Sequence, residues 1–248
     1  MANSRVRRLA LLLGGVAAAL AVACSGDDAP SGNDGVVITP ITSNIPTLTP
    51  APRLIELTGF GMPIAGGCLP NGDQLMPNAP RTYRNGTHEG IDFYAVDNCT
   101  AIARGTQVLA AFDGKVVRAD LAYTDLTQAE NDRFSLNPNT DAALDSFRGR
   151  QVWVDHGVDA TGQAIITRYA HLSGIAPGIN VGMDVVKGQL IAFVGNSGTP
   201  ESISNPSSEM HLHWELRVGD SYLGRALPAV QVRSLYVTLF AQPPAAAR

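Results

Sequence analysis

The sequence predicts a mainly β fold with a compact antiparallel sheet at its core. From about residue 54 onward, apolar and β-branched residues come in short runs, and Gly, Asn and Asp separate one run from the next. Asp113-Gly114 stands between two such runs and is typical of the tight turn in a β-hairpin. The 248 residues are 45% hydrophobic and 16% charged, a globular composition whose length fits one domain with additional segments.

Residues 1–23 are expected to form a signal peptide that is removed on export. Arg5, Arg7 and Arg8 give a basic start, and an apolar stretch of 15 residues follows at 9–23. That stretch is shorter than the roughly 20 residues that span a bilayer as a helix. An uncleaved membrane anchor is the alternative.

Cys24 resembles the lipidated cysteine of bacterial lipoproteins because it follows Leu20-Ala-Val-Ala23. The favoured leucine lies one position too far upstream, so cleavage nearby without lipidation is the alternative. Residues 24–53 are rich in Pro, Thr, Ser, Asp and Gly and have no hydrophobic period, which indicates a flexible linker. We expect an extracytoplasmic protein, in the periplasm or on the cell surface, tethered to the membrane as a lipoprotein.

The charge balance argues against a nucleic-acid partner. Without residues 1–23 the chain keeps 15 of its 18 Lys and Arg residues and all 22 Asp and Glu residues, a formal charge of −7. A strongly cationic surface is therefore not expected. The sequence does not indicate an oligomeric state.

Cys68 and Cys99 are the two cysteines that remain after export. An even pair in an oxidising compartment predicts a disulfide, and two buried thiols are the alternative. The loop that this bridge would close contains His88 and Asp92. We expect the bridge to hold that loop in shape.

The main domain is expected to span residues 54–240, with a disordered tail at 241–248. The apolar runs predict six strands, of which the first two form a hairpin around Asp113-Gly114 and the next two form a second antiparallel pair. In chain order these strands cover residues 107–112, 115–118, 151–154, 164–169, 189–194 and 211–218.

Residues 121–148 interrupt this pattern of strands. The segment is polar, and short helices are predicted at about 127–134 and 141–147. A long insertion between strands usually lies on the surface and often lines a site. Residues 200–209 form a second predicted loop, which leads into the last strand.

Four residues in two segments predict a hydrolytic metal centre. His211 and His213 stand at i and i+2 in an apolar run, so in a strand both imidazoles lie on the same face. Imidazole is a common zinc ligand and a natural proton carrier near neutral pH. His88 and Asp92 can share one side of an extended segment, although alone they are also typical of a surface pair. His156, at the end of a predicted strand, is expected to be structural.

The order of the motifs resembles that of the lysostaphin-type (LytM-like) peptidoglycan metalloendopeptidases, from about residue 59 to 217. The motifs are His88-Glu-Gly-Ile-Asp-Phe93, Gly105-Thr-Gln-Val108, Ala110-Ala-Phe-Asp-Gly-Lys-Val116, Val154-Asp-His-Gly157, Tyr169-Ala-His-Leu-Ser173, Val186-Lys-Gly-Gln189, Gly195-Asn-Ser-Gly198 and His211-Leu-His-Trp-Glu215. The resemblance implies a β core of the barrel-sandwich-hybrid type, with a groove across it and zinc at the groove floor. Long loops would form the walls.

The resemblance also implies roles for individual residues. His88, Asp92 and His213 would bind Zn²⁺, which leaves the fourth tetrahedral position for a water whose pKa zinc lowers to about 7. His211 and His171 would face the substrate instead of the metal. His211 is expected to act as general base, and His171 to orient the water or stabilise the tetrahedral oxyanion.

The implied activity is zinc-dependent hydrolysis of peptide bonds in the stems or cross-bridges of bacterial peptidoglycan. Glu89 is a rival for the role of base on chemical grounds. The chain departs from the family pattern at 121–148 and at 199–210, where relatives have a short turn, so its substrate preference cannot be transferred from a relative.

Two other functions would explain part of the sequence. A non-catalytic relative would bind cell wall or activate another hydrolase, but such adaptors typically lack metal ligands. A biotinyl- or lipoyl-like carrier would explain the glycine-rich rhythm of residues 181–189. It would leave the histidines unexplained, and no convincing lysine for modification is present.

Overall fold

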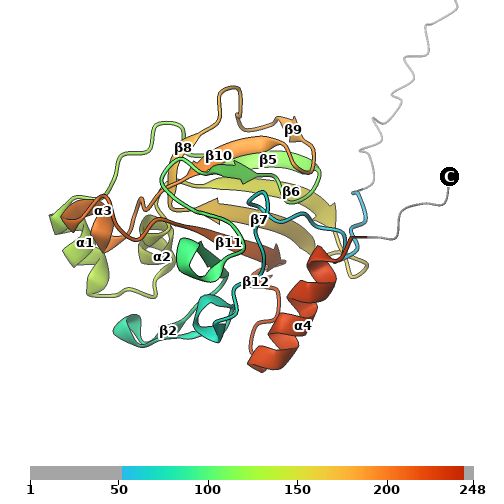
Figure 1. Cartoon of the computed structure of the whole chain (residues 1–248), viewed down its shortest axis with the longest axis horizontal. Coiled ribbons are helices and arrows are strands. Elements are labelled where there is room, and N and C mark those ends of the chain that lie inside the picture. The colour runs from blue at the N-terminus through green and yellow to red at the C-terminus, as the bar shows by residue number, and fades with distance from the viewer. Residues whose placement is uncertain (1–51, 243–248) are drawn as a thin grey trace, which may run out of the picture. The chain divides into compact units, whose positions relative to one another are not determined.

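The computed structural model describes residues 52–242 (Figure 1). The expected signal peptide, Cys24, most of the expected linker and residues 243–248 lie outside the described part. Within residues 52–242, no helix has the length and apolar character needed to cross a bilayer.

The fold is mainly β and antiparallel, as predicted. The largest sheet has seven strands in the order β12-β11-β7-β6-β5-β9, with β3 also paired to β11. Its strands are β3 (Ile91–Tyr94), β5 (Gly114–Ala119), β6 (Val152–Val158), β7 (Ala164–Ala170), β9 (Asp184–Val185), β11 (His211–Val218) and β12 (Ser221–Tyr222). A three-stranded sheet, β4-β10-β8, consists of β4 (Gln107–Leu109), β10 (Leu190–Val194) and β8 (Leu172–Ile175).

Short elements complete the β part of the chain. β1 (Pro80–Arg81) and β2 (Gly86–Thr87) form a separate two-stranded ladder. Three single-turn 3₁₀ helices occur at η1 (Asp73–Leu75), η2 (Thr82–Arg84) and η3 (Ala95–Asp97). Of these, η2 lies between β1 and β2, so this ladder and its tip form one small protrusion.

One hydrophobic core is shared by both larger sheets and by the helix α4 (Ala229–Phe240). Val154 of β6 and Ile191 of β10 are completely buried in it. Helix α4 was not predicted from the sequence; it has several β-branched residues and no side-chain cap at its start. Its buried face packs on β11, where the rings of Trp214 and Tyr236 have their centroids 6.3 Å apart. Tertiary packing of an apolar stripe therefore stabilises this helix.

The predicted hairpin at Asp113-Gly114 is wrong. β4 pairs with β10, whereas β5 pairs with β6 and β9, so the chain passes from one sheet to the other at this point. Val108, Ala110 and Ala111 are all buried, which fits a segment covered on both sides and not the half-exposed strand of a hairpin. The carbonyl of Asp113 accepts a hydrogen bond from His156 Nδ1 at 2.8 Å.

The second predicted pair is confirmed by the register of β6 and β7, in which Val152 lies opposite Tyr169. β6 continues to Val158, so His156 lies within the strand and not at its end. The predicted strands at 189–194 and 211–218 correspond to β10 and β11.

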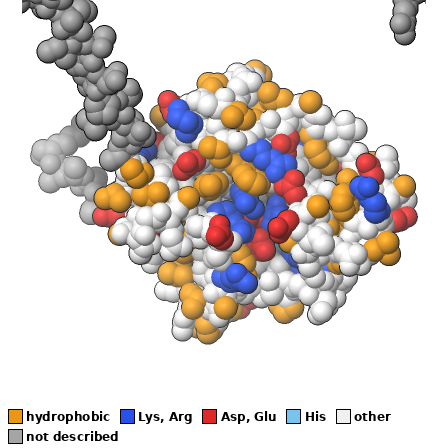
Figure 2. Space-filling view, turned by 180° about the vertical axis from the view of Figure 1, so that it is seen from behind, with side chains coloured by type: hydrophobic (Ala, Val, Ile, Leu, Met, Phe, Trp, Pro, Cys, Tyr) orange, Lys and Arg blue, Asp and Glu red, His pale blue; other side chains and the backbone are white. Residues whose placement is uncertain are grey.

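The insertion at 121–148 contains both predicted helices, α1 (Gln128–Ser135) and α2 (Asp141–Phe147). Thr127 and Glu130 form a capping box at the start of α1, and Thr140 caps α2. The predicted loop at 200–209 begins with a short helix, α3 (Pro200–Ser204), which Thr199 caps. Figure 1 shows these three helices together at one end of the sheets. The face in Figure 2 carries acidic and basic side chains side by side.

Candidate metal centre

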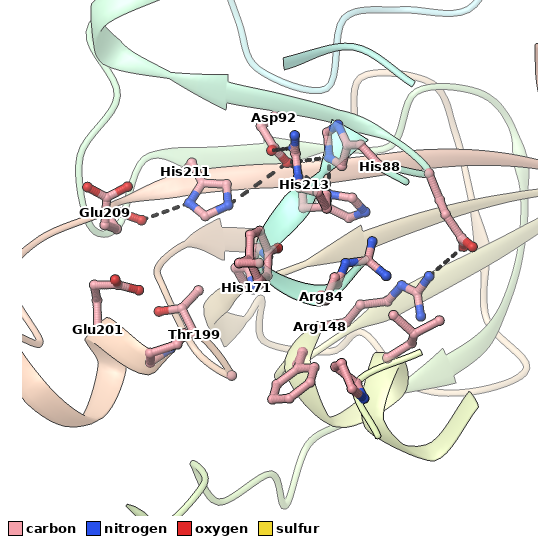
Figure 3. Close-up of a pocket in the computed structure, with 18 of the residues that line it drawn as sticks. Arg84, His88, Asp92, Arg148, His171, Thr199, Glu201, Glu209, His211 and His213 are labelled. Atoms are coloured by element: carbon pink, nitrogen blue, oxygen red, sulfur yellow. Dashed lines mark hydrogen bonds and ion pairs between the residues drawn. The ribbon is translucent and has the colours of Figure 1, made fainter. Parts of the chain in front are cut away.

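The pairing of β3 with β11 brings the predicted metal ligands together. In this antiparallel ladder, Asp92 lies directly opposite His213, so both side chains project from the same face. His88 lies just before β3, and His211 shares the face of His213 two residues earlier. His171 lies between β7 and β8, and β7 also pairs with β11. Figure 3 shows all five side chains around one pocket.

His88, Asp92 and His213 present three ligand atoms to a common point. His88 Nε2 lies 3.0 Å from Asp92 Oδ1 and 3.0 Å from His213 Nδ1, and these last two atoms are 2.8 Å apart. Bonds of about 2.0–2.1 Å to a tetrahedral zinc would separate its ligand atoms by about 3.3 Å. The triangle is close to that size, and two nitrogens with one carboxylate oxygen form a donor set suited to zinc.

Hydrogen bonds on the far side of each imidazole fix its orientation. The Nδ1–H of His88 donates to the carbonyl of Met76 at 3.1 Å, which leaves the Nε2 lone pair for a metal. The Nε2–H of His213 donates to Glu215 Oε1 at 3.0 Å, which leaves Nδ1 for a metal. Each ring therefore offers a single nitrogen to the centre.

The electrostatics of the three residues favour a cation. Burial alone would raise the pKa of Asp92, but the adjacent His88 and His213 rings lower it well below its usual range. Burial works against a charged His213, but hydrogen bonds to the carboxylates of Asp92 and Glu215 raise its pKa. Arg81 also donates to Asp92 Oδ2 at 2.9 Å. Asp92 is thus ionised and held in place.

His171 and His211 lie beside this triangle and outside it. Their ring centroids are 4.6 Å apart, and His211 Nε2 is 4.0 Å from Asp92 Oδ1. The ring of His211 stacks on Tyr94 with centroids 4.3 Å apart. Burial lowers the pKa of both histidines, so both are neutral near pH 7 and can accept a proton.

Backbone carbonyls orient these two rings. The Nδ1–H of His171 donates to Ser197 at 2.9 Å, and that of His211 donates to Glu209 at 2.7 Å. Nε2 of each ring is then the acceptor. His171 and Glu209 have φ values of 58° and 55°, in the left-handed region that residues other than glycine rarely adopt. Such strain often occurs at functional sites, where the surrounding structure imposes it.

The pocket around the five residues has a volume of about 660 Å³. Both atypical segments form its walls, as expected. Figure 3 shows Thr199, Glu201 and Glu209 on one side and Arg84 and Arg148 on another. The insertion contributes Asn131, Ser135, Pro138, Leu144, Phe147 and Arg148.

A contact between the insertion and the β1–β2 protrusion strengthens one wall of the pocket. Arg84 Nη1 donates to Asn139 Oδ1 at 3.0 Å, and Asn139 Nδ2 donates to the carbonyl of Arg84 at 2.6 Å. The two segments are 55 residues apart in sequence. The reciprocal pair therefore joins two segments that are distant in the sequence.

Glu89, the rival base, is engaged elsewhere. Its Oε2 accepts hydrogen bonds from Arg148 Nη2 and Arg217 Nη1, each at 2.7 Å. Both guanidinium groups thus occupy the same oxygen of this carboxylate. Its pairing favours the assignment of the base to His211.

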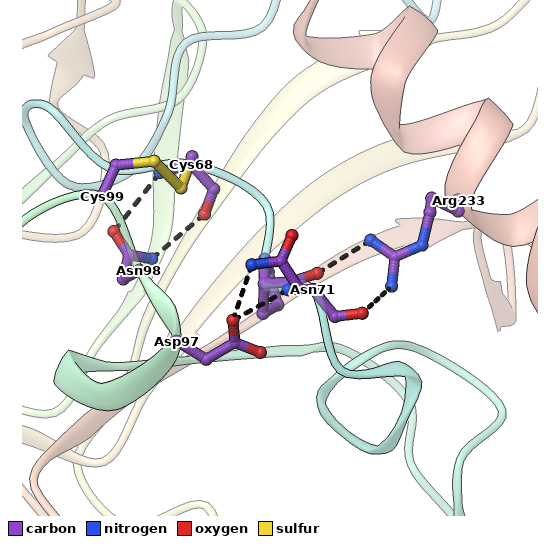
Figure 4. Close-up of a disulfide and its surroundings, with 7 residues drawn as sticks. Cys68, Asn71, Asp97, Asn98, Cys99 and Arg233 are labelled. Carbon is purple, nitrogen blue, oxygen red and sulfur yellow. Dashed lines mark hydrogen bonds between the residues drawn. A yellow bond between two sulfur atoms is a disulfide. The ribbon is translucent and has the colours of Figure 1, made fainter.

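Cys68 and Cys99 form a disulfide (Figure 4). The loop that it closes contains His88 and Asp92. Asn98 makes two hydrogen bonds to the backbone of Cys68, at 3.3 and 3.0 Å. Farther along, Arg233 of α4 donates to the carbonyls of residues 70 and 71 and to Asp73. The loop is thus attached at several points.

Glu215 and Gly90 both shape the site, but no role in it was predicted for either residue from the sequence. Glu215 follows His213 by two residues in the same strand. The alternation that puts His211 and His213 on one face could therefore have placed the carboxylate of Glu215 beside His213. Gly90 lies where β3 meets β11, and a Cβ there would collide with the carbonyl of Trp214. No sequence signal indicates that close approach.

Comparisons with known proteins agree with the motif order. The sequence model of peptidase family M23 matches residues 86–224. No curated protein matches the chain. Among solved structures, the catalytic domain of the antimicrobial peptidase lysostaphin from Staphylococcus simulans is 22% identical, with 71% of this chain and 89% of that chain covered and a TM-score of 0.36.

Two further solved structures have a similar sequence identity to this chain. A zinc-containing peptidase from Vibrio cholerae is 20% identical, with 71% of this chain and 41% of that chain covered and a TM-score of 0.38. A mutant catalytic domain of the prophage-encoded M23 protein EnpA from Enterococcus faecalis is 21% identical, with 61% of this chain and 89% of that chain covered and a TM-score of 0.35. The chain spans less than half the length of the Vibrio protein.

Proposed function

Because the chain belongs to peptidase family M23, we propose that it is an exported zinc-dependent endopeptidase that cleaves peptide bonds in bacterial peptidoglycan. The observation that carries the proposal is the triangle of His88 Nε2, Asp92 Oδ1 and His213 Nδ1, with sides of 2.8–3.0 Å. Bound zinc would lower the pKa of a water molecule and polarise the scissile carbonyl.

The other residues of the pocket have roles that follow from their geometry. His211 has a neutral ring and an Nε2 acceptor, so it is the base that receives a proton from the attacking water. His171 stands next to it and can orient the water or stabilise the negative oxygen of the tetrahedral intermediate. The walls around the five residues would hold an extended peptide and limit the access of bulk water.

The choice of substrate rests on the motif order and on the expected export signal. A lysostaphin-like motif set and a tether at Cys24 would place the domain where the cell-wall polymer lies. We propose that the protein acts outside the cytoplasm, in the periplasm or at the cell surface. The pocket walls differ from the family pattern, so the bond cleaved is left to experiment.

A non-catalytic cell-wall binder or hydrolase activator is the alternative function. Such a role does not need metal ligands or the paired histidines beside them. In this chain His88, Asp92, His171, His211 and His213 all converge on one pocket. That convergence favours catalysis.

The proposal is tested by digestion of purified muropeptides with zinc-loaded wild type and with His213→Ala, with product masses as the readout. We expect new peptide fragments only from the wild type, and bound zinc only in the wild type. His156→Gln is the matched control, since His156 is a buried histidine outside the pocket. Zinc-loaded wild type that releases no fragment would support the non-catalytic alternative.

A further inference from the structure

A buried cluster of charged side chains lies directly behind the candidate metal centre. Glu215 is fully buried, and Arg148 Nε and Arg217 Nη1 donate to its two oxygens at 2.6 and 3.2 Å. Glu89 accepts hydrogen bonds from the same two guanidinium groups. Arg168 Nη1 lies farther away, 3.5 Å from Glu215 Oε2. Nothing in the proposed reaction uses these arginines directly.

Arg148 differs from the other two arginines in the oxygen that it contacts. Its Nε donates to Glu215 Oε1, the same oxygen that accepts the Nε2–H of His213. Arg217 and Arg168 both contact Oε2 instead. The guanidinium of Arg148 therefore holds the acceptor that orients a metal-binding imidazole.

The second contact of the same guanidinium reaches the other side of the centre. Arg148 Nη2 donates to Glu89, which directly follows His88 in the chain. One planar group thus joins the partner of His213 to the neighbour of His88. A lysine would supply the charge from one nitrogen, in place of the two guanidinium nitrogens that make these contacts.

The backbone around Arg148 is also part of the site. Its carbonyl accepts the N–H of His171 at 2.8 Å. Gly149 follows with a φ of 66°, and a Cβ there would collide with Ser197, whose carbonyl holds the His171 ring. Arg148 is the C-cap residue of α2. The insertion is therefore anchored in the framework of the site.

We propose that Arg148 is a positioning residue for the metal centre. It holds Glu215 so that His213 presents Nδ1 to the metal, and it couples the helical insertion to the centre. The inference rests on the proposed zinc function. It assigns to the 121–148 segment a part in metal binding, in addition to its part in the pocket wall.

The test is zinc affinity at neutral pH, measured by competition with a chromophoric chelator for wild type, Arg148→Met, Arg148→Lys and Arg168→Met. We expect both Arg148 variants to bind zinc about 10-fold more weakly, the lower end of the range for loss of a direct partner of a metal ligand, because Arg148 acts on His213 through Glu215. Arg168→Met removes a cation from the same cluster without touching Oε1, so its affinity should stay close to that of the wild type. Visible spectra of the cobalt-substituted proteins should change only in the Arg148 variants.

Each outcome of this experiment is decisive. Equal zinc affinity of wild type and both Arg148 variants overturns the inference and leaves the proposed function intact. Full rescue by lysine overturns it too, because charge alone would then suffice. A well-folded wild type that binds no zinc overturns the proposed function, and this inference with it. If melting curves show that Arg148→Met does not fold, the lysine variant decides.

Discussion

His171 and His211 face each other with ring centroids 4.6 Å apart, and each donates its Nδ1–H to a backbone carbonyl. The two rings are thus fixed as a pair whose Nε2 atoms are acceptors. Burial lowers the pKa of both, which keeps them neutral at the pH where a base is needed. The pair lies beside the metal triangle and is free to act on water and substrate.

The assignment of the base predicts different effects for two substitutions. His211→Ala should lower kcat/KM about 100-fold or more with zinc still bound, because a general base typically contributes that much. Glu89→Gln should keep most of the activity, because its carboxylate is paired with two arginines. Steady-state kinetics on a muropeptide at equal zinc content compares them. The reverse ranking of the two variants would move the base to Glu89.

Removal of the disulfide should lower both stability and metal affinity. The bridge joins residues separated by 31 positions, and in the chain-entropy model such a loop is stabilised by roughly 3–4 kcal/mol. Cys68→Ser with Cys99→Ser should therefore melt roughly 10 °C lower and bind zinc more weakly. Asn98 and Arg233 still hold the loop, so the variant should fold. Unchanged melting temperature and zinc affinity would show that the bridge does not shape the metal-binding loop.

Gly90 should tolerate no side chain. A Cβ at this position would collide with the carbonyl of Trp214 and lie 3.0 Å from His213 Cε1. Gly90→Ala is expected to cost roughly 1–3 kcal/mol of unfolding free energy and to weaken zinc binding. Gly174→Ala is the matched control, because the nearest atom to its Cβ, Phe193 Cδ2, is 3.8 Å away. Urea unfolding and zinc competition measure both effects, and equal results for the two variants would contradict the prediction.

His156 should make the fold sensitive to acid. Burial is the main reason why its pKa falls from 6.5 to about 4 in the folded protein, although its hydrogen bond to Asp113 acts in the opposite direction. Between these two values the unfolded chain binds more protons, so the stability falls as the pH is lowered from about 6.5 toward 4.

The size of this effect is roughly 2–3 kcal/mol between pH 7 and 4.5. His156→Gln cannot be protonated, so it should lose less stability than the wild type over this range. The other buried histidines titrate in both proteins and cancel in the comparison. Urea unfolding at several pH values gives the two curves, which should diverge below about pH 6.5. Parallel curves would show that His156 does not carry the effect.

Local signals in the sequence were sufficient for much of the fold. The helices predicted at about 127–134 and 141–147 correspond to α1 and α2, which begin at the local caps Thr127 and Thr140. Strand alternation placed His211 and His213 on one face. These features depend on residues that are close in sequence or on a regular period.

The features that could not be predicted depend on distant contacts. The turn signal at Asp113-Gly114 is local, but it does not determine which strands pair. Burial on both faces of the segment favours the observed pairs, β4 with β10 and β5 with β6. The helix α4 follows from the packing of Tyr236 on Trp214. Arg148 and Glu215 are 67 residues apart, and no motif links them.

The most direct test of the central claim is the location of zinc by anomalous diffraction at the zinc edge in crystals of the zinc-loaded protein. We predict one ion bound by His88 Nε2, an oxygen of Asp92 and His213 Nδ1 at about 2.0–2.2 Å, with His171 and His211 outside its ligand shell. Zinc absent from this triangle, or bound through His171 or His211, would contradict the account.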